Sequence, residues 1–311
     1  METGYSVVTE VPPGYKRDFD YFLFGQAGHL ALQGEPWMHV YLLHKKNHKV
    51  MAEVAFHPDG DLARSPLRAP FGSFLFSPRI LAQTLQEFIV EVERLLTRKG
   101  ISRVRLTEPP ALYRKREGLL QTILLNRGYQ IQLAELSSII RIDRISFEDK
   151  IDRGEKGRLR QARKKGLTFR LLKIDKLRLA YQFILACSKE RDHSLSMTIE
   201  DLQATAAVFR NEFVLSAVYL QEEMVGASVA LRVHPQILYN FYSGHLKKYD
   251  SLSPIVSLLG GLYGYCEKQQ IQLLDLGTSS LKGQLNFSLL NFKLRLGAEP
   301  SIKLSFEKEL A

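Results

Sequence analysis

An aspartate ends a short apolar run near the end of the sequence. Asp275 follows residues 271–274, which are mostly apolar and predict a buried strand. A buried carboxylate is unfavourable unless it is paired. Asp275 could therefore orient or deprotonate an amine, or it could accept a hydrogen bond from the turn at Gly277 and Thr278. The sequence leaves both interpretations open.

Hydroxyl groups end the preceding strand of the predicted sheet. Tyr242 and Ser243 close an apolar and aromatic run, and His245 follows them. Tyr242 could hydrogen-bond a ligand or return a proton to a leaving group, and His245 could act as a base near neutral pH. Tyr242 also fits a simpler role, because Tyr239 and Phe241 form with it an aromatic stripe of the kind that packs on a sheet.

A basic segment lies in the middle of the chain. The formal net charge is +10, and residues 153–170 hold eight basic residues against one acid, Glu155. We expect the segment to be helical and exposed, and to bind a polyanion. Its candidate phosphate-binding residues are Arg158, Arg160, Arg163, Lys164 and Lys165. A solvated helix face is the alternative.

Several classes of protein and site are disfavoured by composition and spacing. Apolar residues make up 45% and charged residues 24% of the chain, as in globular proteins. His44 and His48 have HxxxH spacing but lie around a predicted hairpin turn, and there is no HExxH or GxSxG motif. We therefore expect neither a metal site nor that kind of serine nucleophile. Cys187 and Cys266 form no CxxC pair, and the N-terminus has no signal-peptide layout. We therefore expect a cytoplasmic protein without transmembrane segments.

The elements that must position these residues occur twice. Each half contains, in the same order, two apolar strands around a polar turn, a helix opened by Ser-Pro, a short buried strand, and a helix running through glycine into a last strand. These landmarks begin near residues 41, 77, 100 and 124 in the first half, and near residues 219, 253, 270 and 291 in the second. We read this as duplication of one α/β unit, with domains at 1–150 and 151–311 and the basic joint at 153–170.

The second copy shows its order most clearly. Its predicted elements are β-α-α-β-β-β-α-β-α-β, a mixed α/β sheet. Thr198 and Asp201 predict a capping box for the second helix. Ser253 is expected to cap the next helix through its side chain, with Pro254 at the first helical position.

This order resembles the GNAT acyltransferase fold, and the tandem arrangement resembles its Fem-type (FemAB-like) branch. The motifs that carry the resemblance, in order, are the basic run RLRQARKKGL, Tyr242-Ser243-Gly244, Ser253-Pro254, Asp275-Leu276-Gly277, Asn291-Phe292-Lys293 and Leu296-Gly297. The first half matches loosely and looks like a degenerate copy that supports substrate binding.

The resemblance implies an N-acyltransferase that moves an acyl or aminoacyl group to a small-molecule or peptide amine. Acyl-CoA or aminoacyl-tRNA would be the co-substrate, with no tightly bound cofactor. In this fold two parallel strands splay apart, and Lys293 would lie near the reacting carbonyl with Asp275 and Tyr242. The implied donor-binding residues are Ser243, Lys247, Lys248, Ser253, Gly277 and Thr278. The implied acceptor-binding residues are Arg191, Asp192 and His193, although a plain solvated loop fits these three equally well.

The sequence also departs from the family. Members that bind acetyl-CoA carry a glycine-containing loop whose amides hold the pyrophosphate, whereas residues 247–254 here read KKYDSLSP and contain no glycine. Lys247 and Lys248 could supply charge in its place. Two other functions remain open: a nucleic-acid-binding module that uses residues 153–170 without chemistry, and a catalytically inactive GNAT-fold ligand sensor.

Overall fold

The C-terminal strand returns to the unit that the N-terminal residues build. The computed structural model describes residues 4–281 and 283–310. Unit 1 comprises Met1–Glu135 and Ile302–Ala311, and unit 2 comprises Leu136–Ser301. The sequence placed the division after residue 150. In the structure it falls within β8 (Gln130–Arg141), and the second half of β16 (Glu299–Glu309) pairs with β7 (Arg103–Thr107) in unit 1.

Unit 1 is a mixed sheet with a core shared between strands and helices. The strand order is β1-β3-β4-β5-β7-β16, in which β3 and β4 form an antiparallel hairpin and β5 and β7 are parallel. Phe56 and Leu106 pack with Phe88 and Ile89 from the apolar face of α2. The helices are η1 (Leu23–Gly25), α1 (Ala27–Gln33), α2 (Ala82–Arg98), η2 (Ala111–Tyr113) and α3 (Glu117–Asn126). The remaining strands are β1 (Tyr5–Val8), β2 (Lys16–Arg17), β3 (Met38–His44), β4 (Lys49–Asp59), β5 (Leu62–Ser65) and β6 (Leu75–Phe76).

Unit 2 has the predicted order of elements, so the predicted fold class is confirmed. Its strands are β9 (Leu167–Leu172), β10 (Phe213–Leu220), β11 (Glu223–His234), β12 (Ile237–His245) and β13 (Leu273–Thr278), with the small hairpin β14 (Ser280–Leu281) and β15 (Gln284–Leu285). Its longer helices are α5 (Arg153–Lys164), α6 (Leu177–Lys189), α7 (Ile199–Val208), α8 (Pro254–Lys268) and α9 (Phe287–Arg295). Its short helices are α4 (Phe147–Lys150), η3 (Ile174–Lys176), η4 (Arg210–Glu212) and η5 (Lys247–Leu252). The sheet order is β8-β13-β12-β11-β10-β9.

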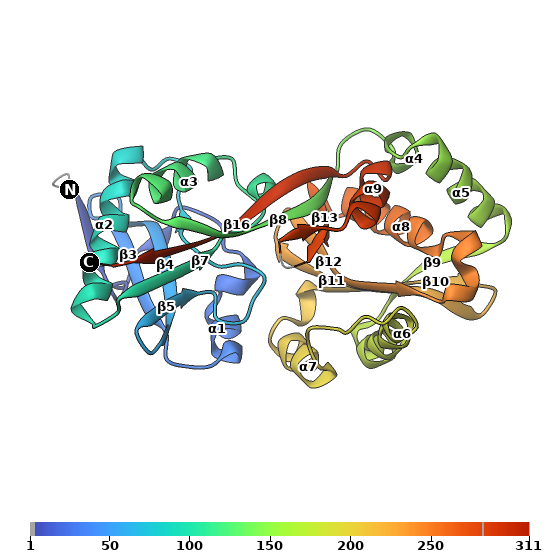
Figure 1. Cartoon of the computed structure of the whole chain (residues 1–311), viewed down its shortest axis with the longest axis horizontal. Helices are drawn as coiled ribbons and strands as arrows, with labels where there is room; N and C mark the ends of the chain where they lie inside the picture. The colour runs from blue at the N-terminus through green and yellow to red at the C-terminus, as the bar shows by residue number, and fades with distance from the viewer. Residues whose placement is uncertain (1–3, 282, 311) are drawn as a thin grey trace. The chain divides into compact units, whose positions relative to one another are not determined.

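Helices cover both faces of the unit 2 sheet. Figure 1 shows α8 on one face and α6 with α7 on the other. Gly261 lets α8 approach β9, because a Cβ at this position would lie 2.1 Å from the ring of Phe169. Gly297 follows α9 with a φ of +78° and lies against Lys150, where a Cβ would come within 2.9 Å. Both glycines therefore allow close packing that a larger residue would disrupt.

Two capping predictions had different outcomes. Thr198 and Asp201 form the predicted capping box of α7. Ser253 lies at the N-cap of α8, but its side chain makes no capping hydrogen bond within the described residues. Its φ of +47° is left-handed and differs from the extended backbone of a usual N-cap, so this prediction was wrong.

No helix within residues 4–281 and 283–310 is long and apolar enough to cross a membrane.

Candidate functional site

The adjacent strands β12 and β13 pair over only a short distance. They are parallel, as predicted, with Ile237, Leu238 and Tyr239 opposite Leu273, Leu274 and Asp275. The recorded pairing stops there, although β12 continues to His245 and β13 to Thr278. A cavity of about 260 Å³ is lined by residues of both strands beyond this point, including Asn240, Ser243 and Leu276. The end of the parallel pairing thus opens into a cavity of unit 2.

Lys293 enters the wall of this cavity from α9. Its side chain is buried, and its Nζ donates hydrogen bonds to the carbonyl oxygens of Gly277 and Thr278, both at 2.9 Å. Burial lowers the pKa of Lys293 from 10.5 to about 8, and the negative charge of Asp275 opposes this shift. An ammonium group has three N–H donors, so one donor remains beyond the two carbonyl contacts.

Asp275 makes the turn hydrogen bond that one of its two interpretations predicts. It is 1% exposed, and its Oδ1 accepts a hydrogen bond from the backbone N–H of Gly277 at 2.7 Å. Asp275 is not among the residues that line the cavity. The carboxylate therefore fixes the turn whose carbonyls hold Lys293, and it also contributes a favourable charge nearby.

Asn240 is a lining residue that sequence reasoning missed. Its side chain is buried, its Oδ1 accepts a hydrogen bond from Ser228 Oγ at 2.6 Å, and its Nδ2 lies 3.4 Å from Ser243 Oγ. The sequence signal that could have identified Asn240 is a polar residue between two aromatic residues of a strand. Ser243, which was predicted, lines the cavity beside it.

Tyr242 does not line the cavity. Its hydroxyl accepts a hydrogen bond from the backbone N–H of Met197 at 2.9 Å and lies 2.6 Å from Ser196 Oγ. A bulge leaves Phe241 without a partner between the pairs Val229–Tyr242 and Ala230–Asn240. Tyr242 thus holds the segment before α7 in place.

The predicted acceptor loop contributes two residues to the cavity, Arg191 and His193. Arg191 donates to Asp250 Oδ1 at 2.9 Å and to the backbone oxygen of His245 at 2.9 Å. The Nε2 of His245 lies 2.7 Å from the same Asp250 oxygen. Burial, followed by the charge of Arg191, lowers the pKa of His245. Asp192 has a φ of +57° and is not a lining residue.

The other predicted donor-binding residues, Ser253 among them, do not line the cavity. Lys248 pairs with Glu223 at 2.7 Å, and the backbone N–H of Lys247 donates to Glu190. Gly277 and Thr278 contribute the carbonyls that receive Lys293. In the place of a phosphate-binding loop the chain forms η5, and this helix is fixed by these side-chain contacts.

The basic segment forms the exposed helix α5, as predicted. Arg160 and Arg163 both pair with Glu148 of α4, at 2.7 and 2.9 Å, and Arg158 pairs with Glu155 at 2.5 Å. Part of the positive charge is therefore compensated by acids that precede the basic run. Among the five candidate phosphate-binding residues, Lys164 and Lys165 make no ion pair within the described residues, so these two are the most available to an anion.

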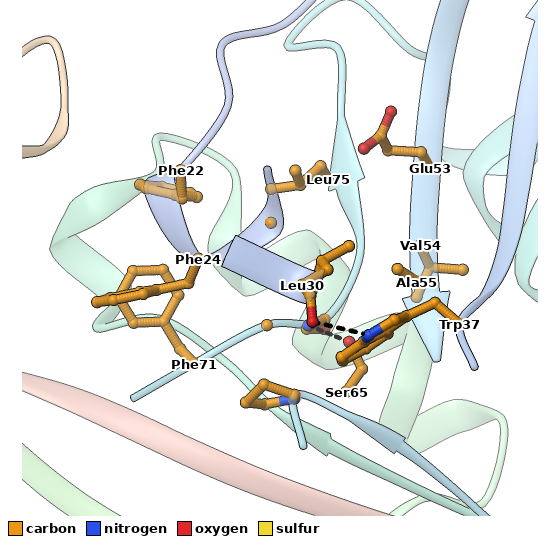
Figure 2. Close-up of a pocket in the computed structure, with 14 residues that line it drawn as sticks. Phe22, Phe24, Leu30, Trp37, Glu53, Val54, Ala55, Ser65, Phe71 and Leu75 are labelled. Atoms are coloured by element: carbon orange, nitrogen blue, oxygen red, sulfur yellow. Dashed lines mark hydrogen bonds between the residues drawn. The ribbon is translucent and has the colours of Figure 1, made fainter. Parts of the chain in front are cut away.

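Unit 1 contains a smaller cavity, lined by an aromatic group. Figure 2 shows Phe22, Phe24 and Phe71 on one side and Trp37 on the other, with the Trp37 indole N–H donating to the Leu30 carbonyl at 3.0 Å. Its volume of about 30 Å³ is roughly that of one water molecule. This size suits packing better than ligand binding.

No cluster of side chains that could hold a metal ion occurs within residues 4–281 and 283–310.

Known proteins resemble this chain in structure rather than in sequence. No protein-family model and no curated protein matches the sequence. The chain is similar to the crystal structure of FemX with a TM-score of 0.71 and 12% identity, over 94% of this chain and 93% of FemX. L-PGS from Bacillus licheniformis gives a TM-score of 0.58 and 15% identity, over 91% of this chain and 87% of that one.

A third solved structure is also similar to this chain at low sequence identity. The C-terminal domain of a putative lysylphosphatidylglycerol synthetase from Agrobacterium fabrum gives a TM-score of 0.56 and 8% identity, over 91% of this chain and 87% of that domain. Similarity at these identities shows a shared fold. The chain therefore has the α/β fold of FemX, and the Fem-like fold that the sequence resemblance predicted is confirmed.

Proposed function

We propose that unit 2 is an N-acyltransferase that moves an acyl or aminoacyl group from a CoA-type or tRNA-type donor to an amine. One observation carries this proposal: the ends of β12 and β13 beyond their parallel pairing line one cavity together with the buried Lys293. The fold shared with FemX supports it. Both donor types occur in the cytoplasm, which is where we expect the protein to act.

The chemistry needs a site for negative charge. A neutral amine attacks the carbonyl carbon, the new C–N bond forms, and the carbonyl oxygen becomes an oxyanion. The carbonyl then re-forms as the C–S or C–O bond to the carrier breaks, and the proton that the attacking nitrogen loses goes to the leaving group. In this proposal the remaining N–H donor of Lys293 stabilises the oxyanion, because a preorganised cation in a partly enclosed cavity acts more strongly on developing charge than one in water.

The other predicted residues take supporting roles in this proposal. Asp275 positions the Gly277 turn, and through it Lys293. Tyr242 fixes the segment before α7. Ser243 contacts the donor, and Lys247 supplies charge to its phosphates near η5. Arg191 and His193 face the acceptor, and their positive charge favours the neutral, nucleophilic form of its amine.

The test compares Lys293→Ala with Lys268→Ala, which removes an exposed lysine from the end of α8. Each protein is incubated with acyl-CoA or aminoacyl-tRNA donors and a panel of amines, and the products are measured by mass spectrometry. Native mass spectrometry of the freshly purified protein identifies a copurifying donor. We expect Lys293→Ala to lower turnover about 10²-fold or more, with unchanged folding. Full turnover in this variant would contradict the role of Lys293.

A further inference from the structure

Apart from Cys187, the ionisable side chains that line the unit 2 cavity are all basic. Arg191, His193, His245 and Lys293 all line it. Within the described part of the chain, no aspartate or glutamate does so. The cavity therefore presents positive charge and N–H groups to a ligand.

Asn240 adds to this character. Its carbonyl oxygen already accepts the hydroxyl of Ser228, at 2.6 Å. Its Nδ2 donates a hydrogen bond to Ser243 Oγ at 3.4 Å, which leaves the second N–H of the amide for a ligand. A carbonyl oxygen of a ligand could accept from this N–H, whereas an ammonium group would find hydroxyl oxygens but no negative charge in the lining.

The carboxylates beside lining residues do not line the cavity themselves and have partners of their own. Glu190 accepts the backbone N–H of Lys247 at 3.2 Å and lies 3.9 Å from Arg191. Asp250 Oδ1 is within 2.9 Å of Arg191 Nη2 and 2.7 Å of His245 Nε2. Asp275 Oδ1 accepts the N–H of Gly277. None of these three carboxylates lines the cavity, so none of them contacts a ligand that is bound there.

The rest of the wall is apolar. Ile255 and Leu259 from α8, Leu276 from β13, and Leu289 and Phe292 from α9 complete the lining. The volume of about 260 Å³ lies just below the usual range for pockets that hold drug-sized ligands. This size and surface suit a short aliphatic chain.

We propose that the acyl group held in this cavity is a short, uncharged aliphatic chain rather than an aminoacyl group. The inference rests on the proposed acyl transfer and specifies its donor. An aminoacyl group would place its ammonium beside Lys293 without a carboxylate partner, and two like charges at close range in a partly dry site repel strongly. A branched or straight alkyl chain would instead contact the apolar wall.

Two small amides of nearly the same shape test this directly. Alaninamide carries an ammonium group at the position where isobutyramide has a methyl group. Binding to the full chain is measured by protein-observed NMR at about pH 6.5, where an α-amino group is protonated and Lys293, with a pKa of about 8, is charged. We expect isobutyramide to bind at least about tenfold more tightly than alaninamide, and to shift the resonances of the cavity residues.

Variants of α9 provide matched controls. Leu289 lines the cavity and is 37% exposed, and Leu294 lies on the same helix, is 39% exposed and is not a lining residue. Leu289→Asp supplies the missing carboxylate at the third position of the helix, where an acid is also favourable for the helix dipole. It should raise alaninamide affinity about tenfold. Leu294→Asp should leave it unchanged, and Leu289→Asn should raise it much less than Leu289→Asp, because an amide carries no charge.

The outcomes separate this inference from the function on which it rests. Equal or tighter binding of alaninamide at the cavity of the wild-type protein would overturn the uncharged acyl group and leave acyl transfer standing. Binding of neither amide at the cavity would overturn both proposals. Equal gains in alaninamide affinity in Leu289→Asp and Leu294→Asp would show that a negative charge anywhere on α9 attracts the ligand. This result would also overturn the inference.

Discussion

The titration of Lys293 gives the most quantitative prediction. Its pKa falls from 10.5 to about 8 on folding because the side chain is buried. Between these values the unfolded chain holds a proton that the folded chain has lost. The free energy of unfolding therefore rises with pH across this window. The full shift corresponds to roughly 3 kcal/mol, of which about 2 kcal/mol is gained between about pH 7 and about pH 9.5.

The perturbation that isolates this effect is Lys293→Met, which keeps the length of the side chain and removes the titrating amine. Urea unfolding of the wild-type protein and the variant is compared at the two pH values. Other titrating groups contribute equally to both proteins and cancel in the difference. We expect wild-type stability to rise by about 2 kcal/mol relative to the variant. The Cε resonance of Lys293, assigned by its absence from the variant, should titrate with a midpoint near the pKa of about 8.

The same titration reports on chemistry. If the charged ammonium stabilises an oxyanion, the rate of transfer falls as pH rises through about 8. Lys293→Met should lack this part of the profile. A stability difference that stays constant with pH, together with a midpoint near 10.5, would refute the burial argument for Lys293.

Two further predictions concern the turn and the basic helix. Asp275→Asn should lower the free energy of unfolding by about 1 kcal/mol, because a charged hydrogen-bond acceptor of the turn is replaced by a neutral one. Urea unfolding and pH–rate profiles would separate this role from that of a base, since only loss of a base would remove a limb of the pH dependence. Lys164→Gln with Lys165→Gln should weaken binding of a single-stranded RNA and lower its salt slope by roughly one per lost phosphate contact. Arg160→Gln with Arg163→Gln should have the smaller effect, because these side chains already have acidic partners. Fluorescence anisotropy between about 50 and 200 mM salt measures both, and the reverse order would contradict the assignment.

The order of elements was predictable because local signals mark it. The capping box at Thr198 and Asp201 begins α7, and Pro254 begins α8. Apolar runs identified β12 and β13, and their parallel pairing followed from the fold resemblance. Lys293 was found through a motif, and its burial and carbonyl contacts required coordinates.

The remaining features depend on contacts that the sequence does not mark. The bulge at Phe241 interrupts the alternation of side chains, so Asn240 and Ser243 share the cavity wall and Tyr242 does not. The basic segment predicted from the sequence spans residues 153–170, and basic and acidic residues were compared only within it. The partner of Arg160 and Arg163 is Glu148, which precedes that window, and only the packing of α4 beside α5 shows this.

The pairing of β16 with β7 has a consequence for biosynthesis. Thr107 and Ser305 are opposite one another in the unit 1 sheet but are separated by 198 positions in the chain. At roughly 5 to 20 residues per second, the ribosome needs about 10 to 40 seconds to add that length. During that time β7 lacks one neighbouring strand, and its free edge could pair with other nascent chains. The earliest-made part of the protein is thus the last to be completed, and chaperones that shield strand edges would matter most for this unit.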